Sequence, residues 1–257
     1  MSASVQRILL GVAGFAVLLG GWQLASTGEA TQRALPGVGE TAAHAVALLG
    51  AGQTWVQIGE TLWIAVLGLL LGIAGGVVVG VVIGLSTTAM HATRFALDFL
   101  RPIPAIVILP LVMLLLGPTT QMAVFLSFFA VILPAIAQVA AGVDDVDPVA
   151  AATARSFGMS RAEVIWRVVL PSTSAHIGTA VRVSAPISLM IVTIAGLLGG
   201  APGLGRQLAL AQTTGRFADL IAYVVILGVL GLLVQIATES LERRLLHWHT
   251  SFRAEVV

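Results

Sequence analysis

The chain has 257 residues, of which 58% are hydrophobic and 10% charged, and its mean hydropathy is +1.01. Soluble domains carry about 25% charged residues, so this composition indicates a membrane protein and argues against an ordinary soluble enzyme. All thirteen basic residues are arginine and cysteine is absent, which excludes a P-loop lysine, a Schiff-base lysine, a cysteine nucleophile and a thiolate metal site. The net charge of +1 gives no general attraction to nucleic acid, and any ATP that drives this protein must be bound by another chain.

Six apolar stretches approach the roughly 20 helical residues that a bilayer core about 30 Å thick requires. They comprise residues 8–25, 61–85, 102–117, 122–142, 177–199 and 218–238. The first is alternatively a cleaved signal peptide, since Arg7 precedes it and small residues end it, but it exceeds the usual apolar length of about 7–15 residues. The pattern predicts an all-α polytopic membrane protein that forms one domain over residues 1–257, with a core at 61–238.

The second span carries a glycine at every fourth position. These residues are Gly68, Gly72, Gly76, Gly80 and Gly84. The spacing keeps them on one helical face, and small residues let a second backbone approach closely where lipid provides no hydrophobic drive for association. We expect a tight packing contact within the bundle; a dimer contact or a moving helix is the alternative.

The third span is short and contains Pro102, Pro104 and Pro110. Proline cannot donate the backbone hydrogen bond that continues a helix. Interrupted helices at membrane depth are tolerated where they are buried in protein or line a cavity. We therefore expect a kinked or broken helix inside the bundle.

The arginines orient the spans. Ten of the thirteen fall at or near one face of the predicted bundle, and only Arg33, Arg206 and Arg216 fall at the other. Because basic residues accumulate on the cytoplasmic side, and six spans return the chain to its starting side, we expect both termini in the cytoplasm. The external segments are then residues 26–60 and 200–217, and the cytoplasmic segments are residues 86–101 and 143–176.

The longest cytoplasmic segment contains a loop, residues 143–172, with the signals of two short helices. Asp147 can cap the first helix, Pro148 suits its first position, and an alanine-rich run follows. Gly158 can take the left-handed conformation that ends a helix. The first helix is therefore predicted to end in a sharp turn.

The second helix of this loop begins at Ser160 and Glu163, which form an S-x-x-E capping box, and we expect Pro171 to end it. Its apolar face lies beside Arg161. A helix–turn–helix that is too short to span and too apolar for a free loop favours docking on a partner at the inner surface. An amphipathic helix resting on lipid is the alternative.

This loop resembles the cytoplasmic loop of ATP-binding-cassette (ABC) importer permeases, whose motif reads Glu-Ala-Ala, three residues, Gly, nine residues, Ile, one residue and Leu-Pro. Aligned on Gly158, the second half fits, with Val168 at the isoleucine position. The first half departs from the motif, because its three positions hold Ala152, Thr153 and Ala154. The glutamate of the motif is therefore missing.

Further segments resemble the sulfonate, taurine and nitrate branch of these importers, and together they cover nearly the whole chain. They are Leu35-Pro36, residues 99–117, residues 141–148, the PGLG sequence at 202–205 and the LHWH sequence at 246–249. The resemblance implies the type I importer permease fold, with six transmembrane helices in a bacterial inner membrane. It also implies a second permease chain, expected to be a further copy, two ABC ATPase subunits that hold ATP and Mg²⁺, and an external solute-binding protein. It implies no cofactor on this chain and no nucleic-acid partner.

By the same resemblance, the loop docks on the ATPase and transmits its movement without catalysing a reaction. The residues expected at that docking surface are Ala152, Thr153, Ala154, Gly158, Arg161, Leu170 and Pro171.

The candidates for the translocation path are Pro102, Pro104, Ser127, Arg182, Ser184 and Ser188. Ionisable groups inside spans are costly and often functional, and broken helices expose backbone groups to a cavity. The serines can instead hydrogen-bond to their own helix, and Arg182 can extend to the cytoplasmic interface. No acidic residue lies deep in a predicted span, so a small anion is favoured over a cation.

Three other protein classes compete with this interpretation: an ion-gradient-driven secondary transporter, a channel and an intramembrane hydrolase. A secondary transporter needs its own coupling site, and no convincing internal repeat marks one. A hydrolase needs a nucleophile beside a base, but His176 is the only histidine near a predicted span. His247 and His249, which flank Trp248, fit an interfacial anchor better than a metal pair, because no third ligand is near.

Overall fold

The computed structural model describes residues 3–28 and 35–245, and these ranges contain helices and no strand. The long helices are α1 (Ala3–Ser26), α3 (Gly52–Gly84), α6 (Thr120–Asp144), α9 (Leu170–Gly199) and α11 (Phe217–Leu245). The shorter ones are α2 (Val38–Gly50), α4 (Thr87–Leu100), the 3₁₀ turn η1 (Ala105–Ile108), α5 (Leu109–Leu116), α7 (Pro148–Ser156), α8 (Arg161–Val164), the π turn η2 (Ile165–Val169) and α10 (Leu204–Thr213). The all-α fold is confirmed, while the predicted anchor at 247–249 lies outside the described residues.

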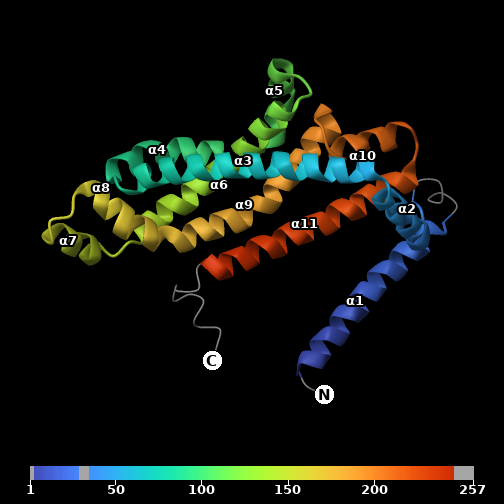
Figure 1. Cartoon of the computed structure of the whole chain (residues 1–257), viewed down its shortest axis with the longest axis horizontal. Coiled ribbons are helices and arrows are strands. Elements are labelled where there is room, and N and C mark those ends of the chain that lie inside the picture. Colours follow the sequence, from blue (N-terminus) through green and yellow to red (C-terminus); the bar gives the residue numbers. More distant parts are fainter. Residues whose placement is uncertain (1–2, 29–34, 246–257) are drawn as a thin grey trace.

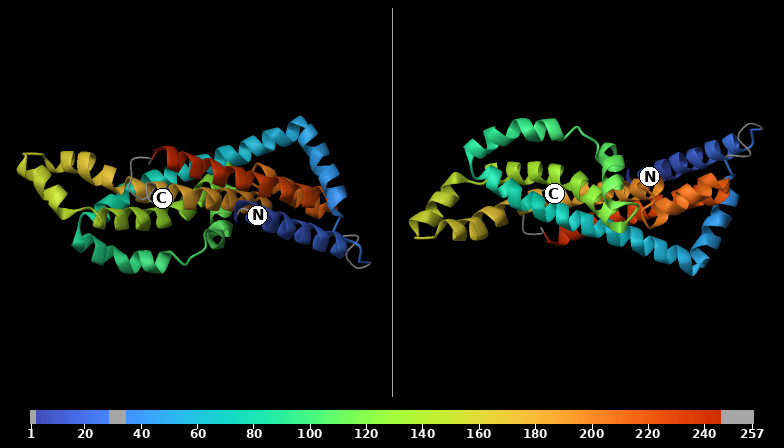
Figure 2. Two further views of the ribbon diagram at one scale, coloured as in Figure 1. Left: turned by 90° about the horizontal axis from the view of Figure 1, so that it is seen from below. Right: turned by 90° about the horizontal axis from the view of Figure 1, so that it is seen from above.

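Five helices are long and apolar enough to cross a membrane, and a sixth span exists if a bent pair is counted as one. The pair is α4 with η1 and α5, whose axes differ by 75°. The expected break by proline is present between α4 and η1, and the predicted bounds of 102–117 contain η1 and α5. Residues 87–100, which were expected to form part of a cytoplasmic connection, form the separate helix α4, which belongs to the third span if the bent pair is counted as one. Figure 2 shows α4 lying to one side of α3 and α6 before the chain returns to α5.

The centre of the molecule is a three-helix contact between α3, α6 and α9, in which the five glycines of α3 face α6. A Cβ built on Gly72 would lie 2.6 Å from Cβ of Val131, and one on Gly80 would lie 2.8 Å from Cβ of Val139. The opposing α6 residues also recur every four positions and comprise Ser127, Val131, Ala135, Val139 and Val143. The glycine stripe is thus a packing seam within the chain.

Hydrogen bonds between side chains join the same three helices. The hydroxyls of Ser127 on α6 and Ser188 on α9 lie 2.7 Å apart, and Ser188 donates to the backbone oxygen of Ala65 on α3, also at 2.7 Å. Ser127 and Ser188 are fully buried. In an apolar environment such satisfied polar groups help to fix how helices pack against one another.

The helix α1 diverges from this bundle (Figure 1). Only 6% of its apolar stretch is buried. Its end is tied to the start of α2, because the Trp22 indole N–H donates to the Pro36 oxygen at 3.1 Å and the Gln23 side chain accepts from the Val38 N–H at 2.9 Å. The helix α1 runs toward the end of the molecule that holds α2 and α10, and α11 runs away from that end. The outer ends of these two helices, Ala3 and Leu245, therefore both lie away from it.

Candidate coupling surface and translocation path

The helices α7 and α8 extend beyond the other helices at one end of the molecule, in every view of Figures 1 and 2. As expected, the Asp147 carboxylate accepts from the Val149 N–H at 2.8 Å, and Pro148 is the first residue of α7. Gly158 has a φ of +85°. The N–H groups of Gly158 and Met159 donate to the oxygens of Arg155 and Ala154 at 2.9 and 3.2 Å. This is the paired-bond C-terminal cap that needs a left-handed residue.

The second helix starts as predicted. Ser160 and Glu163 form the complete capping box, and one Glu163 oxygen accepts from both the N–H and the hydroxyl of Ser160 at 2.9 Å. The pKa of the Glu163 carboxyl is lowered most by the hydrogen bond from the backbone N–H of Ser160 and next by the hydrogen bond from the Ser160 hydroxyl. Both bonds stabilise the charged carboxylate.

The expectation that Pro171 ends this helix is wrong. The helix runs from Arg161 through the π turn η2 and continues as α9 to Gly199. A proline inside an α-helix lacks an N–H donor and clashes with the carbonyl four residues earlier. The wider π turn lies directly before Leu170 and Pro171 and re-arranges the backbone bonds there. Leu170 and Pro171 therefore belong to the start of a long helix, not to a loop.

The remaining predicted docking residues occupy two environments. Ala152, Thr153 and Arg161 are exposed, but Ala154 is buried against Val164 and neighbouring apolar residues. Ala154 is thus a core residue that holds α7 against α8. Sequence reasoning missed Phe157, which lies beside the glycine turn with 82% of its surface exposed; an aromatic residue next to a predicted turn was the available signal.

A cavity of about 560 Å³ opens on the bundle between the break before η1 and the helices α6 and α9. Pro104 lines it, whereas Pro102 does not. Its walls are mostly apolar, and its polar lining residues include Arg101 and Gln138. Pro134, inside α6, also contributes to the wall. Of the six candidates for the path, Pro104 is the one that the structure places at this cavity.

The three candidate serines lie elsewhere. Ser127 and Ser188 form the buried hydrogen bonds described above, and Ser184 is 1% exposed with no hydrogen-bond partner in the described part of the chain. The structure places Ser127 and Ser188 in contacts between helices, and none of the three serines lines this cavity; their role in the path stays a prediction. Helical spacing identified the face that they share, but it does not tell an interior contact from a cavity wall.

Arg182 forms an ion pair that the sequence did not reveal. Its Nε lies 3.1 Å from Oε2 of Glu242, whose side chain is only 7% exposed while that of Arg182 is 42% exposed. Thr179 also donates to Glu242, at 3.5 Å. Glu242 was missed because the last span was predicted to end at residue 238, whereas α11 continues to Leu245. The pair joins α9 to α11, and Arg182 is not among the residues that line the cavity.

Arg182→Met is expected to lower the free energy of unfolding by about 1–3 kcal/mol, because it leaves the buried Glu242 carboxylate without its partner; the partial exposure of Arg182 keeps the loss below that of a fully buried pair. Glu242→Gln should cost less, and the double variant should recover part of the loss. Thermal unfolding of the purified protein in detergent measures all three. Strictly additive effects of the single variants would show that the ion pair contributes nothing.

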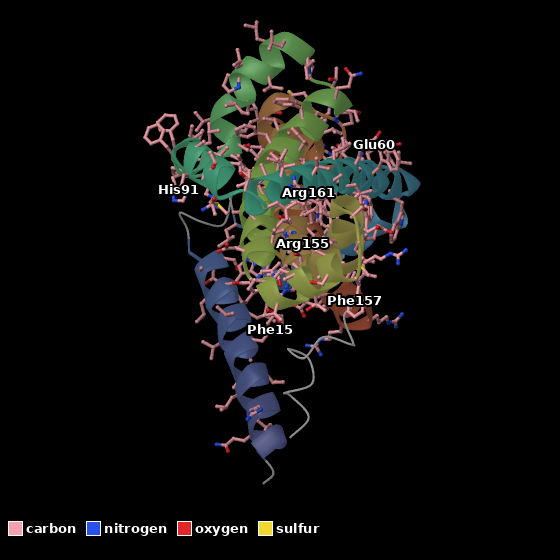
Figure 3. The ribbon with its side chains drawn as sticks, turned by 90° about the vertical axis from the view of Figure 1, so that its left-hand side faces the viewer. Phe15, Glu60, His91, Arg155, Phe157 and Arg161 are labelled. Atoms are coloured by element: carbon pink, nitrogen blue, oxygen red, sulfur yellow. The ribbon has the colours of Figure 1, made fainter. Side chains whose placement is uncertain are left out.

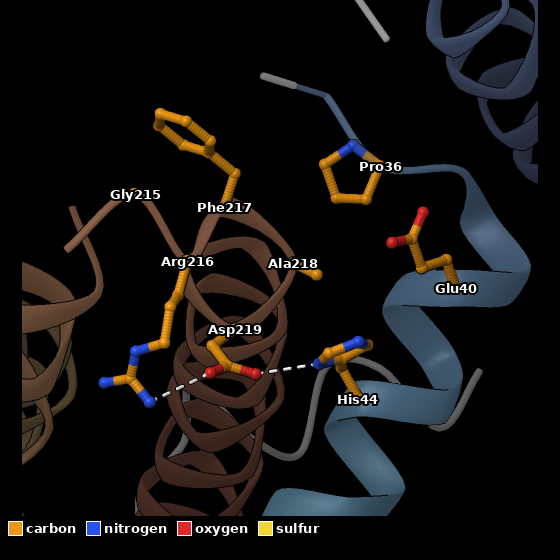
Figure 4. A pocket seen from close by; sticks show the side chains of 8 residues that line it. All are labelled: Pro36, Glu40, His44, Gly215, Arg216, Phe217, Ala218 and Asp219. Atoms are coloured by element: carbon orange, nitrogen blue, oxygen red, sulfur yellow. Dashed lines mark hydrogen bonds and ion pairs between the residues drawn. The ribbon is translucent and has the colours of Figure 1, made fainter. Parts of the chain in front are cut away.

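A second pocket, of about 370 Å³ (Figure 4), lies where α2 meets the start of α11, at the end of the molecule opposite α7 and α8 (Figure 1). The carboxylate of Asp219, at the start of α11, lies 2.7 Å from Nδ1 of His44 on α2 and 3.2 Å from Nη1 of Arg216. Glu40 and Pro36 complete one wall. The cluster fastens α2 to α11, so it positions the connection between the first two long helices, α1 and α3.

The sequence pattern of the family described as binding-protein-dependent transport system inner membrane component matches residues 72–247. The chain belongs to this family. The matched range contains four of the five seam glycines, from Gly72 to Gly84, together with the proline-marked break before η1 and the α7–α8 pair. The permease is thus a subunit of an ABC importer and a multi-pass inner membrane protein, and nothing found supports the alternative of a secondary transporter.

Curated relatives of the permease are named for three related solutes. It is 28% identical to SsuC of Escherichia coli, named as a permease for aliphatic sulfonates, over 98% of this chain and 97% of the relative. It is 26% identical to the taurine transport system permease protein TauC of Escherichia coli, over 76% and 71% of the two chains. It is 26% identical to the nitrate import permease protein NrtB of Leptolyngbya laminosa, over 90% and 85%.

Solved structures share the fold of the permease. A crystal structure of a bacterial ABC transporter involved in the import of the acidic polysaccharide alginate has a chain that matches with a TM-score of 0.68 and 16% identity, over 93% of the permease and 95% of that chain. The fold is therefore that of type I ABC importer permeases, as the resemblance implied.

Proposed function

We propose that the permease forms the membrane path for a small anion, such as a sulfonate, taurine, nitrate or a similar organic acid. An external binding protein delivers the solute, and a separate pair of ABC ATPase subunits holds ATP and Mg²⁺ and drives transport. The names of the relatives support the solute class. The observation that carries the coupling role is the α7–α8 pair, which extends beyond the transmembrane helices and carries the exposed Phe157 and Arg161.

The helix geometry explains how such a pair could move the bundle. Because α8, η2 and α9 form one continuous helical rod from Arg161 to Gly199, a displacement of α8 is passed directly to α9. The contacts of α9 with α6 and α3 then carry it to the glycine seam. Closure of an ATPase dimer beneath α7 and α8 would thus bias the bundle between inward-facing and outward-facing states.

The cavity beside Pro104 supports an anionic solute. Arg101 is the one charged side chain that lines it, and no Asp or Glu among the described residues does so. A cationic lining residue favours passage of an anion. The neighbouring α5 is strongly exposed and apolar, with Leu114 at 82% exposure, which fits a second copy of the permease closing the path from that side.

The orientation follows from the same arrangement. The α7–α8 pair must reach the ATPase, so its end of the molecule is cytoplasmic, and the pocket around Asp219 is external. Ala3 and Leu245 point away from the external end. We therefore place both termini in the cytoplasm.

Transport in proteoliposomes tests this function. The assembled complex, with binding protein outside and ATP inside, is expected to accumulate radiolabelled taurine, an alkanesulfonate or nitrate, and the solute that raises the melting temperature of the binding protein should be the one accumulated. Inactivating the ATPase should abolish uptake. Uptake that survives this inactivation but collapses with the proton gradient would refute the proposal.

A further inference from the structure

The α7–α8 pair contains a cavity with two arginines. The cavity has a volume of about 530 Å³ and lies between these helices and the end of α3. Arg155 and Arg161 line it, together with apolar side chains that include Leu85, Val164 and Ile165. Seen from this end of the molecule, Figure 3 shows the two arginines close together, with Phe157 at the edge.

The arginines keep most of their hydrogen-bonding capacity. The Arg161 guanidinium has no partner among the described residues, and Arg155 uses only its Nε, which donates to the Ala151 oxygen at 3.1 Å. Each guanidinium offers five N–H donors. No Asp or Glu among the described residues lines the cavity, and the carboxylates of Asp147 and Glu163 instead accept hydrogen bonds at the starts of α7 and α8. The cavity is therefore positively charged and lacks an internal counter-ion.

We propose that this cavity receives an acidic side chain of the ATPase, which Arg155 and Arg161 bind by charge-assisted hydrogen bonds. Apolar walls beneath two cations suit the methylene stem and carboxylate of a glutamate or aspartate side chain. The inference rests on the proposed function and adds the chemistry of the partner surface. Ala152 stands at the position where the motif described above has its glutamate, so this loop lacks that negative charge. On this face the permease therefore contributes the cations, and the ATPase contributes the anion.

The surroundings of the cavity favour a protein over lipid as the occupant. Phe157 is highly exposed on the same tip, and exposed aromatic and arginine side chains grouped together are typical of the energetic centres of protein interfaces. This tip lies at the far end of the molecule, beyond the transmembrane helices (Figure 1). Trp166, which is also exposed, lies further along the same continuous helix toward the bundle and suits the lipid boundary. Arg155, Phe157 and Arg161 therefore lie beyond that boundary.

The absence of lysine permits a direct test. Arg161→Lys or Arg155→Lys introduces the only side-chain amine of the chain and keeps the positive charge. A carbodiimide applied to the assembled complex joins an amine to a carboxylate in direct contact, and mass spectrometry locates the link. We expect each introduced amine to be linked to an Asp or Glu of the ATPase. Arg243→Lys, an exposed cation at the end of α11, is the matched control and should give no such link.

A charge reversal provides the second measurement. Arg161→Glu should reduce ATPase retention on the purified permease at least tenfold, and the loss should shrink as salt concentration rises, since salt screens like-charge repulsion. Normal retention by this variant, or introduced amines linked only to carboxylates of the permease, would overturn the inference while leaving the proposed function standing. Reduced binding to phosphatidylglycerol vesicles with unchanged ATPase retention would also overturn it, in favour of lipid. Failure of the unaltered permease to retain any ATPase would instead refute the proposed function.

Discussion

Gly158→Val is expected to abolish solute uptake while the permease still folds and inserts. Gly158 has a φ of +85°, and a Cβ at this position would meet nothing within 4 Å, so the obstacle is the backbone conformation alone. A β-branched residue held there costs about 1–3 kcal/mol. To relieve this strain, the turn must open and break the two hydrogen bonds from Gly158 and Met159 to the end of α7. The α7–α8 pair then loses its fixed angle, and uptake by proteoliposomes should fall at least tenfold.

Gly158→Asn is the control for this result. Asparagine enters the left-handed region more readily than other residues with a Cβ, so this variant should keep substantially more uptake than Gly158→Val, although it adds a side chain of similar size. The melting temperature of both variants in detergent should stay close to that of the unaltered permease, since the turn is exposed. Full uptake by Gly158→Val would show that the turn is not needed for coupling.

Gly76→Leu is expected to prevent accumulation of the folded permease, or to lower its melting temperature strongly. A Cβ at this position overlaps Cβ of Ala135 and lies 3.2 Å from the backbone N of Ile136, and backbone atoms of a helix cannot move aside. Overpacking a core typically costs about 1–3 kcal/mol, and the cost here should reach the upper end because α3 and α6 must separate along their length. The quantity of monodisperse protein and its thermal unfolding in detergent measure the effect.

The matched control is Gly59→Leu, the same substitution in the same helix. A Cβ at Gly59 meets nothing within 4 Å, so we expect a stability change within about 0.5 kcal/mol. Equal damage from the two substitutions would mean that helix α3 tolerates no leucine for a reason other than the seam. A harmless Gly76→Leu would contradict the close approach of α3 and α6.

Features set by neighbouring residues could be predicted from the sequence. The Asp147 cap, the Gly158 turn and the Ser160–Glu163 box all depend on bonds spanning a few residues, and the structure contains each of them. The stripe of glycines also follows from helical periodicity. The break at the third span was predicted because proline acts on its own helix, but the length of the arm before it was not.

The family, the all-α class and the position of the α7–α8 pair were thus determined by local chemistry and by the order of motifs along the chain. Tertiary structure decided which side chains meet. It placed Ser127 and Ser188 in a helix junction, paired Arg182 with Glu242, and brought Arg155 and Arg161 to one cavity. Periodicity assigns a residue to a face of its helix, whereas the partner of that face depends on how distant helices pack, and this information is not contained in any short stretch of sequence.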